Sequence, residues 1–289
     1  MIVNMNILET WQFNVIAYFV SVVVYFQYYK LAVMDAERDG AATLLLQTIA
    51  SVAVLSLAFF IPFTFPSDWK VYLLLVGACF FYALNDRLQT TSRKHLEVSV
   101  FSLVNQLSTV FLILIGLTIF QEPIILSKMI GVGCIIFGNI ILFYRRGKFQ
   151  FNKHVWIGVL ATFFFALAIS IDIGISQQFN LPFYIMLTLT IPALIIFFIE
   201  RIRISEVVRE YNGRNRRYYL ITGIAWALTI FFTLRAFQFG EVTTIVPLQA
   251  TSIFLNVAIA YFFQGERENG WRKLIAAGLI FFGLSLTIF

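Results

Sequence analysis

The stretch E97-V-S-V-F-S-L-V-N-Q-L-S-T-V-F-L-I-L-I-G-L-T-I-F-Q-E122 decides the fold, because the chain repeats it as E241-V-T-T-I-V-P-L-Q-A-T-S-I-F-L-N-V-A-I-A-Y-F-F-Q-G-E266. At a constant offset of 144 residues, Glu97 aligns with Glu241 and Glu122 with Glu266. After a one-residue slip, K128-M-I-G-V-G133 aligns with K273-L-I-A-A-G278. Two apolar segments joined by a short acidic turn therefore occur once in each half. Such a duplication in an apolar chain is typical of membrane proteins built from repeats.

The composition predicts a membrane protein. Of the 289 residues, 60% are hydrophobic and only 12% are charged, and the mean hydropathy is +0.85. A soluble domain of this length needs more charge to cover its surface. The apolar residues gather in runs of about 20, the length at which a helix crosses a ~30 Å hydrocarbon core. We therefore predict an integral, multi-pass protein of the cell (inner or plasma) membrane, with the lipid bilayer as its surroundings.

Breakers between the apolar runs define ten predicted spans, at approximately 11–31, 41–61, 70–89, 98–120, 124–143, 155–177, 182–200, 218–238, 243–263 and 271–288. The segment R145-R-G-K-F-Q-F-N-K153 is the natural seam between five spans and five more. The predicted fold is therefore all-α, a polytopic membrane protein with ten transmembrane helices in two inverted five-helix repeats. The repeats are residues 1–147 and 148–289.

The distribution of Lys and Arg predicts the orientation. Eighteen of the 21 cations lie in the loops after the first, third, fifth, seventh and ninth spans. This bias places those loops in the cytoplasm and both termini outside. The loop between the fourth and fifth spans carries one cation, whereas its duplicate between the ninth and tenth carries three. Equivalent loops of a five-span repeat must lie on opposite sides, so the charge count supports the inversion.

Each half also contains a span that ends in a Glu turn, followed by a lysine and a glycine-rich span. The residues concerned are F120-Q-E122, Lys128, Gly131, Gly133 and Gly138 in the first half, and Q264-G-E266, Lys273, Gly278 and Gly283 in the second. This pattern resembles the EamA-type ten-helix permeases of the drug/metabolite transporter superfamily, across nearly the whole chain. The resemblance implies alternating-access secondary transport of a small organic solute (a metabolite, amino acid or amphipathic compound), driven by a proton or substrate gradient.

The sequence departs from that family in two respects. Family members usually have a proline midway along the fourth and ninth spans, where this chain has Ser108-Thr109 and Ser252-Ile253. Family members are also commonly drawn with cytoplasmic termini, which the charge count contradicts. We follow the charges for the orientation.

Ionisable residues inside apolar spans are candidate functional residues, because each costs about 2.5–3.5 kcal/mol on insertion scales. Asp172 lies late in the sixth span and Arg235 late in the eighth, so the two reach a similar depth. They form either a structural ion pair or part of a substrate or proton-coupling site. Asp86 and Arg87 end the third span, where adjacent charged residues commonly reach lipid headgroups.

Uncharged polar residues in the middle of spans form a second candidate set. Asn105 and Gln106 lie in the fourth span, and Gln249 is the duplicate of Asn105 in the ninth. Pseudo-symmetry would place Asn105 and Gln249 beside a central cavity, whereas the alternative is hydrogen bonding between helices. Trp226, midway along the eighth span, is the aromatic candidate. The predicted substrate-binding residues are therefore Asn105, Gln106, Asp172, Trp226, Arg235 and Gln249.

Two further groups of residues carry structural predictions. The glycines of the fifth and tenth spans recur at near-helical spacing, which favours close helix packing over the alternative of a hinge. Tyr25, Tyr28 and Tyr29 lie near the end of the first span, where aromatic side chains commonly anchor a helix at the membrane interface.

No motif in the sequence indicates an enzyme, a cofactor or a metal. The patterns GxxxxGK[ST], HExxH and GxSxG are absent, and the two cysteines, Cys79 and Cys134, form no CxxC. The expected partners are a small-molecule substrate, the lipid bilayer and a coupling proton, and no nucleic acid. The alternatives are a membrane-embedded enzyme acting on lipid-linked substrates, which would need a polar cluster at one membrane face, and a non-transporting channel or scaffold.

Overall fold

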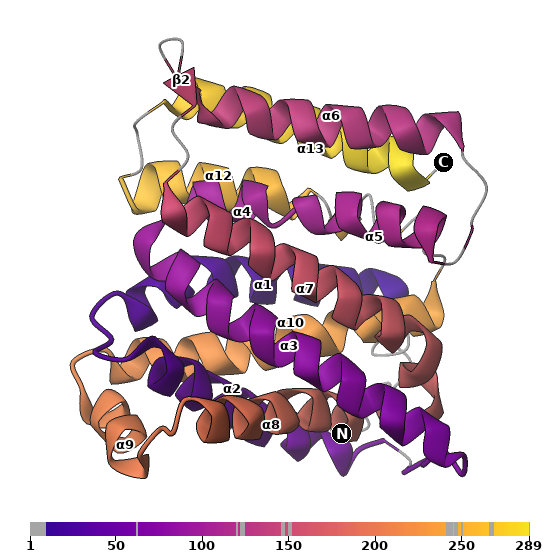
Figure 1. The fold of residues 1–289 in the computed structure, drawn as a ribbon, viewed down its shortest axis with the longest axis vertical. Coiled ribbons are helices and arrows are strands. Elements are labelled where there is room, and N and C mark those ends of the chain that lie inside the picture. Colours follow the sequence, from indigo (N-terminus) through magenta and orange to yellow (C-terminus); the bar gives the residue numbers. More distant parts are fainter. Residues whose placement is uncertain are drawn as a thin grey trace, which may run out of the picture.

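The computed structural model describes residues 10–61, 63–119, 121, 125–145, 148–149, 152–240, 245, 248–249, 251–265 and 269–288. Helices cover all ten predicted spans, and a hairpin of two short strands, each of two residues, joins the halves (Figure 1). The elements are α1 Trp11–Val33, α2 Asp39–Ala58, α3 Trp69–His95, α4 Val98–Val104, α5 Leu107–Thr118, α6 Leu126–Phe143, β1 Tyr144–Arg145, β2 Lys148–Phe149, α7 Lys153–Ile175, η2 Ser176–Gln178, α8 Leu181–Ile199, α9 Ile204–Asn212, α10 Arg216–Phe239, α12 Ser252–Phe263 and α13 Gly270–Ile288.

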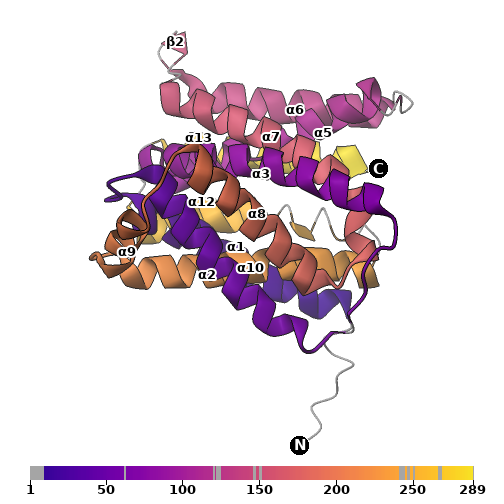
Figure 2. The same cartoon turned by 60° about the horizontal axis from the view of Figure 1, so that its bottom comes forward.

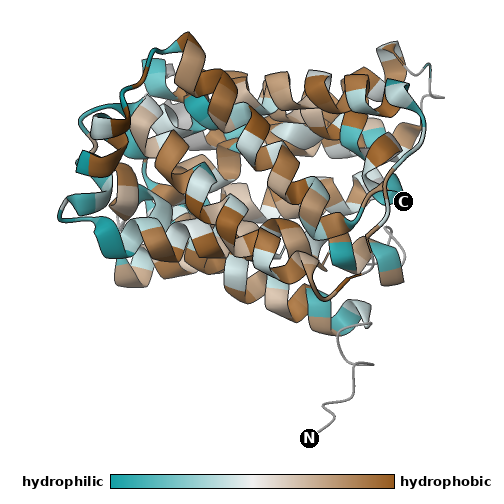
Figure 3. Cartoon of the chain, turned by 90° about the horizontal axis from the view of Figure 1, so that it is seen from below, coloured by the Kyte–Doolittle hydropathy of each residue, from teal (hydrophilic) through white to brown (hydrophobic). Residues whose placement is uncertain are grey.

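The all-α membrane fold is confirmed. Seven helical segments are long and apolar enough to cross a membrane, with α4 and α5 counted together as Val98–Thr118. Two shorter apolar helices, Leu126–Ile141 and Ser252–Phe263, fall on the predicted fifth and ninth spans. Figure 3 shows hydrophilic residues gathered near the ends of the helices and mainly hydrophobic ones between them.

Three local features differ from the predicted spans. The third helix continues to His95, six residues past the predicted end. Its last turn contains Arg93, Lys94 and His95, and the helix dipole favours cations at this end. The fourth span is broken between α4 and α5. The loop after α8 contains a further helix, α9, whose capping box is formed by the Glu206 side chain and the Arg203 backbone. Figure 2 shows α9 beside the ends of α2 and α10, which it contacts.

The helix pairings follow the duplication. α1 packs on α10 and α3 on α7, while α2 packs on α8 and α6 on α13. The duplication relates α1 to α7, α2 to α8, α3 to α10 and α6 to α13. Exchanging each helix with its counterpart turns the first pairing into the second and leaves the last two unchanged. The contacts therefore have the symmetry expected of two related halves.

The crossing of α6 and α13 shows the same symmetry at the level of single atoms. A Cβ on Gly131 would lie 2.5 Å from the carbonyl oxygen of Gly283, and one on Gly283 would lie 2.6 Å from that of Gly131. The duplicate contact joins Gly138 and Ala276, where a Cβ on Gly138 would lie 3.0 Å from the Ala276 oxygen. Close packing is confirmed at Gly131, Gly138 and Gly283, because no larger residue fits the backbone separation. It is wrong for Gly133 and Gly278, where an added Cβ would meet no described atom within 4 Å.

Candidate functional site

A cavity of about 300 Å³ lies between the two halves of the chain. Its walls come from α1, α3, α7, α8 and α10, together with the α4–α5 junction and Gln249. Five of the six predicted site residues line it: Asn105, Gln106, Asp172, Trp226 and Gln249. The duplicated polar positions thus face a shared cavity, as the pseudo-symmetry argument requires.

The break in the fourth span places Asn105 and Gln106 at the cavity. The backbone N–H of Gln106 donates to the Leu103 carbonyl at 3.1 Å, and that of Ser108 donates to the Asn105 carbonyl at 3.2 Å. These bonds span three residues instead of four, so the α-helical ladder is interrupted here. The Ser108 hydroxyl also donates to the Asn105 carbonyl at 2.8 Å. A helix break without proline therefore places Asn105 and Gln106 at the cavity near the middle of the predicted fourth span, as in the discontinuous helices of transporters.

The ninth span has a related break at the duplicate position. α12 begins at Ser252, the duplicate of Ser108, and the Thr251 backbone N–H and hydroxyl both bond the Leu248 carbonyl, at 3.0 and 2.6 Å. Gln249 is 9% exposed, and its buried side-chain Nε2 has no hydrogen-bond partner among the residues that the structure describes. An unsatisfied buried amide of this kind is a candidate donor to a bound molecule.

One face of α3 supplies the largest polar share of the cavity wall. Tyr82, Asn85, Asp86, Gln89 and Arg93 recur every three or four residues, so they follow one another along a single side of the helix. The sequence-based expectation that Asp86 reaches headgroups is wrong, because Asp86 is 3% exposed and lines the cavity. Tyr82, Gln89 and Arg93 were not among the predicted site residues, although their helical spacing could have revealed them.

Two buried carboxyl groups face the cavity, each surrounded by uncharged donors. Asp86 accepts hydrogen bonds from Gln47 Nε2 at 2.8 Å and Asn85 Nδ2 at 2.7 Å. Asp172, which is 5% exposed, accepts one from the Tyr82 hydroxyl at 2.6 Å and another from the Tyr184 hydroxyl. Among the described residues, neither carboxyl group forms an ion pair.

Arg235 does not join the cavity. It is not among the residues that line it; its Nη1 donates to Gln238 Oε1 at 3.1 Å and its guanidinium lies 4.6 Å from the Phe239 ring centroid. The ion pair considered between Asp172 and Arg235 is not formed. The two residues lie at similar depth along their helices, but depth along a helix does not determine which side of the helix faces inward.

Two of the three predicted interface anchors are instead part of the cavity wall and its base. Tyr25 is 5% exposed and Tyr29 is fully buried. The Tyr25 ring stacks on Trp226 with centroids 5.8 Å apart, and Tyr29 meets Trp226 edge-on at 6.4 Å. The prediction was wrong for these two because the inner part of α1 is covered by protein and not by lipid.

A layer of buried hydroxyl groups lies beside the cavity, toward the face that carries α9 and the β1–β2 hairpin, which we call the basic face. The Tyr29 hydroxyl bonds Thr90 Oγ1 at 2.8 Å, and the Thr43 hydroxyl donates to the same oxygen at 2.7 Å. All three residues are 0% exposed. These hydrogen bonds join α1, α2 and α3 beside the cavity.

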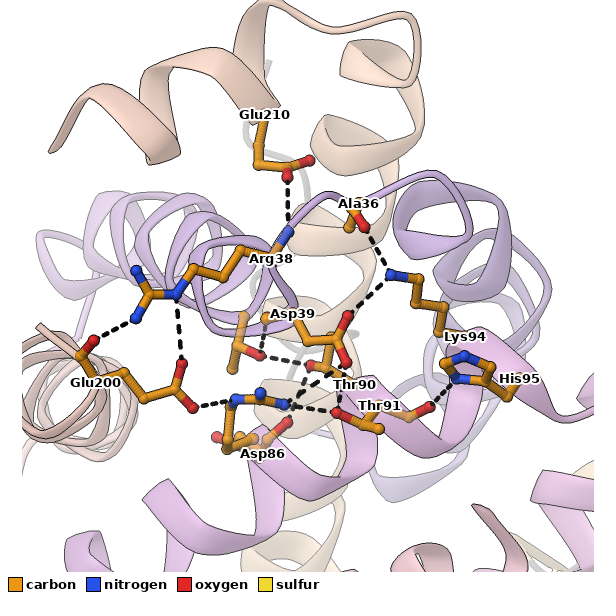
Figure 4. A network of polar contacts seen from close by, with 12 residues as sticks. Ala36, Arg38, Asp39, Asp86, Thr90, Thr91, Lys94, His95, Glu200 and Glu210 are labelled. Atoms are coloured by element: carbon orange, nitrogen blue, oxygen red, sulfur yellow. Dashed lines mark hydrogen bonds and ion pairs between the residues drawn. The ribbon is translucent and has the colours of Figure 1, made fainter. Parts of the chain in front are cut away.

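Next to this layer lies an ionic cluster formed by Arg38, Asp39, Arg87, Lys94, Glu200 and Glu206. Figure 4 labels Arg38, Asp39, Lys94 and Glu200 of this cluster. Lys94 Nζ lies 3.0 Å from Asp39 Oδ1, and the Thr91 hydroxyl donates to Asp39 Oδ2 at 2.6 Å. Arg38 pairs with Glu206 at 2.8 Å, and Arg87 pairs with Glu200. The cluster joins α2 and α3 of the first half to α8 and α9 of the second. It therefore holds the two halves together at the basic face.

Comparisons with known proteins give a family and a fold. Residues 9–144 match the model of the EamA-like transporter family. No curated protein matches the sequence. A solved structure titled only "Crystal structure of protein" aligns with a TM-score of 0.62 over 94% of this chain and 94% of its own, at 16% identity. At that identity the likeness shows a shared fold across almost the whole chain, and no more than the fold.

Proposed function

We propose, from the premise that residues 9–144 belong to the EamA-like transporter family of the drug/metabolite transporter superfamily, that this multi-pass membrane protein is a secondary active transporter. Its substrate is a small organic solute, which binds in the central cavity and crosses by alternating access. The family resemblance expected from the sequence is confirmed for residues 9–144, and a family of transporters agrees with the expectation of a non-enzymatic function. The cell membrane is its proposed location.

The observation that carries this proposal is the placement of the cavity. It lies between the halves, near the middle of the spans, and both copies of the duplicated segment contribute a polar residue to it, Asn105 and Gln249. Transporters built from inverted repeats bind their substrates at this depth and at this kind of interface. A scaffold protein would have no need of unpaired polar groups at such a cost.

The basic face supports alternating access. On this side the ionic cluster holds the two halves together and the Tyr29–Thr90–Thr43 layer joins α1, α2 and α3, so we infer that substrate does not pass there in this conformation. At the opposite face the halves are joined by uncharged contacts: Asn180 Nδ2 donates to the Ile61 carbonyl at 2.9 Å, and Phe65 and Phe183 pack with ring centroids 5.3 Å apart. We propose that the cluster breaks when the other face closes.

Asp86 and Asp172 are the proposed proton-coupling groups. Both are carboxyl groups inside the membrane-spanning bundle without a cationic partner among the described residues, and such groups mark proton relays in transporters. Hydrogen bonds from neutral donors stabilise the ionised form, and protonation removes the charge when the cavity is exposed to the other side. Proton movement would then be linked to substrate movement.

The test begins with purified protein and a thermal-shift screen against metabolite classes, because a ligand that binds only the folded state raises the melting temperature. A hit is then assayed in liposomes by counterflow, in which an unlabelled internal pool drives uptake of labelled solute. Accumulation above equilibrium indicates a carrier, whereas simple equilibration indicates a channel. Lack of counterflow for every stabilising compound would contradict the transporter assignment.

Variants connect the assay to the cavity. Trp226→Ala removes an aromatic wall that lines the cavity, so counterflow should fall, whereas Arg209→Gln, on the exposed α9, should leave it unchanged. Arg235→Ala tests whether the site is limited to the cavity wall or also includes Arg235. The cavity geometry predicts normal transport for this variant, and a loss of transport would extend the site beyond the cavity wall.

A further inference from the structure

We propose that the end of the cavity nearest the basic face is a carboxylate-binding site centred on Arg93, and that the transported solute is an organic carboxylate with an apolar or aromatic body. This inference rests on the proposed transport function and names the substrate class of the same cavity. It is carried by the burial of Arg93, by the chemistry of its neighbours and by the lack of an ion pair between Arg93 and any described residue.

Arg93 lies in an aromatic cage. The guanidinium carbon is 4.6 Å from the Tyr25 ring centroid, 4.2 Å from that of Phe26, 4.5 Å from that of Tyr29 and 4.2 Å from that of Phe101. The residue is 4% exposed and lines the cavity. Aromatic faces attract a cation electrostatically but provide no lone pairs for its N–H groups. The cage thus holds the charge while leaving hydrogen bonds unmade.

The polar neighbours of Arg93 satisfy only part of the guanidinium. Its Nη2 donates to Gln89 Oε1 at 3.1 Å, while its buried Nε has no hydrogen-bond partner in the described part of the chain. The two tyrosine hydroxyls of the cage are already engaged: Tyr25 accepts from Gln89 Nε2 at 3.1 Å, and Tyr29 bonds Thr90. A guanidinium offers five N–H donors in a planar fork that matches a carboxylate. Free donor capacity therefore remains at the cavity.

A second buried cation, Lys273, differs from Arg93 because it has a counter-ion. Lys273 is 3% exposed, and its Nζ lies 2.5 Å from Glu97 Oε2. Arg93 is buried to the same degree, yet among the described residues it forms no ion pair, although Asp86 lines the same cavity. A buried charge without a counter-ion is destabilising. A ligand carboxylate would accept hydrogen bonds directly from the guanidinium, whereas the hydrogen bonds that Asp86 and Asp172 accept come from other residues. Water competes little with such bonds in this environment.

The rest of the cavity accommodates the apolar body of such a ligand. Phe26, Phe165, Ile169, Leu189, Trp226 and Ile230 line it, and its volume of about 300 Å³ is at the small end of ligand pockets. Gln89 is the positioning residue, since its amide contacts both Arg93 and Tyr25. Asp86 and Asp172 disfavour a second negative charge, so a monocarboxylate fits better than a dicarboxylate.

The test uses matched probe pairs that differ only in the charged group. Benzoate and benzamide, and 3-phenylpropionate and 3-phenylpropionamide, are each titrated into the purified full-length protein while the melting temperature and affinity are measured. In at least one pair the carboxylate should bind about tenfold or more tightly than the amide, because charge-assisted hydrogen bonds are the stronger kind. Equal binding of the members of both pairs, including no binding by either, would overturn the proposal.

Variants assign the effect to Arg93. Arg93→Gln should abolish the preference for the carboxylate, and Arg93→Lys, which keeps the charge and the cage contacts but loses the fork, should retain part of it. The matched control is Arg216→Gln, which removes an arginine that lies 4.4 Å from the Tyr211 ring centroid outside the cavity. An unchanged preference in Arg93→Lys and Arg93→Gln would place the carboxylate elsewhere. Retained counterflow of a neutral solute, without carboxylate preference, would refute this inference and leave the transporter proposal intact.

Phenylalanine provides a separate arm of the same experiment. It carries the body and carboxylate of 3-phenylpropionate and adds an ammonium group. Tighter binding of phenylalanine would indicate that a cavity carboxyl group, Asp86 or Asp172, also contacts the ligand, and Asp86→Asn and Asp172→Asn would identify which. In either result the dependence on Arg93 must persist if the carboxylate site is correct.

Discussion

The charged residues on one face of the helix α3 form ion pairs, whereas those on another face form none with a described residue. On one face, Arg87 and Lys94 belong to the ionic cluster, where each has a carboxylate partner. On the other face, Asp86 and Arg93 line the cavity, where neither forms an ion pair with a described residue. The two faces are only one residue apart in sequence at each of these positions. Figure 4 labels Asp86, whose backbone carbonyl accepts a hydrogen bond from the Thr90 hydroxyl at 3.0 Å.

The difference indicates different roles. Paired charges satisfy one another and hold elements together, whereas unpaired buried charges cost free energy and persist where function requires them. Removing a cluster charge should therefore reduce stability more than it affects binding. Removing a cavity charge should reduce transport while leaving stability almost unchanged. Substitutions in the cavity and in the cluster test this separation, and the largest effect is expected at Asp172.

Asp172→Asn tests the cavity face. The amide is the same size as the carboxyl group, and the Tyr82 and Tyr184 hydroxyls can rotate to accept as well as donate, so the variant should fold. Transport should fall about tenfold or more, because a proton-coupling group has been lost. The expected change in melting temperature is about 2 °C or less. Counterflow, proton-driven uptake and thermal unfolding of the same preparation measure the three quantities.

The outcomes separate the possible roles of Asp172. Loss of proton-driven uptake with retained counterflow would identify it as a coupling group. Loss of both, with weaker ligand binding, would place it in the substrate site. Normal activity in both assays would show that Asp172 only ties α3 to α8 through the two tyrosines.

Asp39→Asn tests the cluster face. Asp39 contacts Lys94, Arg87 and Thr91, and its side chain is 16% exposed. The variant leaves two partly buried cations without their full partner, so the free energy of unfolding should fall by about 1–3 kcal/mol. Melting temperatures in detergent measure the loss, and Asp39→Asn combined with Lys94→Met should recover part of it.

An exposed ion pair on the same face is the control for Asp39→Asn. Arg209 and Glu37 lie 2.6 Å apart, but their side chains are 64% and 66% exposed. Glu37→Gln should therefore change stability by about 0.5 kcal/mol or less. A loss as large as that of Asp39→Asn would mean that burial does not decide the strength of these pairs.

The sequence predicted the features that depend on local pattern and on duplication. Apolar runs located all ten spans, and the repeat of Asn105 at Gln249 identified two residues that do face a common cavity. The glycines that allow α6 and α13 to cross closely were recognised from spacing alone. These properties are encoded by neighbours in the sequence or by comparison of one half with the other.

The sequence-based analysis failed where the surroundings of a side chain decide its role. Arg93 was counted as a loop cation, because the apolar run ends near residue 89. In the structure α3 continues to His95, and Arg93 is buried in its last turn. Arg235 was assigned to the site from its depth, which leaves the direction of the side chain undetermined. Tyr25 and Tyr29 were assigned to the interface for the same reason. Helix packing, which brings α1 and α3 together, is not visible in hydropathy.

Glu206 provides the smallest and most specific test of the cluster. The backbone N–H of Arg203 donates to Glu206 at 2.8 Å, and this bond, with Arg38, holds the pKa of the carboxyl group below its usual range. A lowered folded-state pKa means that the stabilisation is present above the unfolded-state pKa of about 4.5 and is lost as the pH falls through the lower folded-state value. The difference in melting temperature between the wild type and Glu206→Gln should therefore be constant near neutral pH and shrink below about pH 4.5. Because Glu206 is solvent-accessible, salt should also reduce that difference. A difference that persists at low pH and high salt would mean that Glu206 acts through packing, and the cluster would then owe less to its charges than the contrast with the cavity implies.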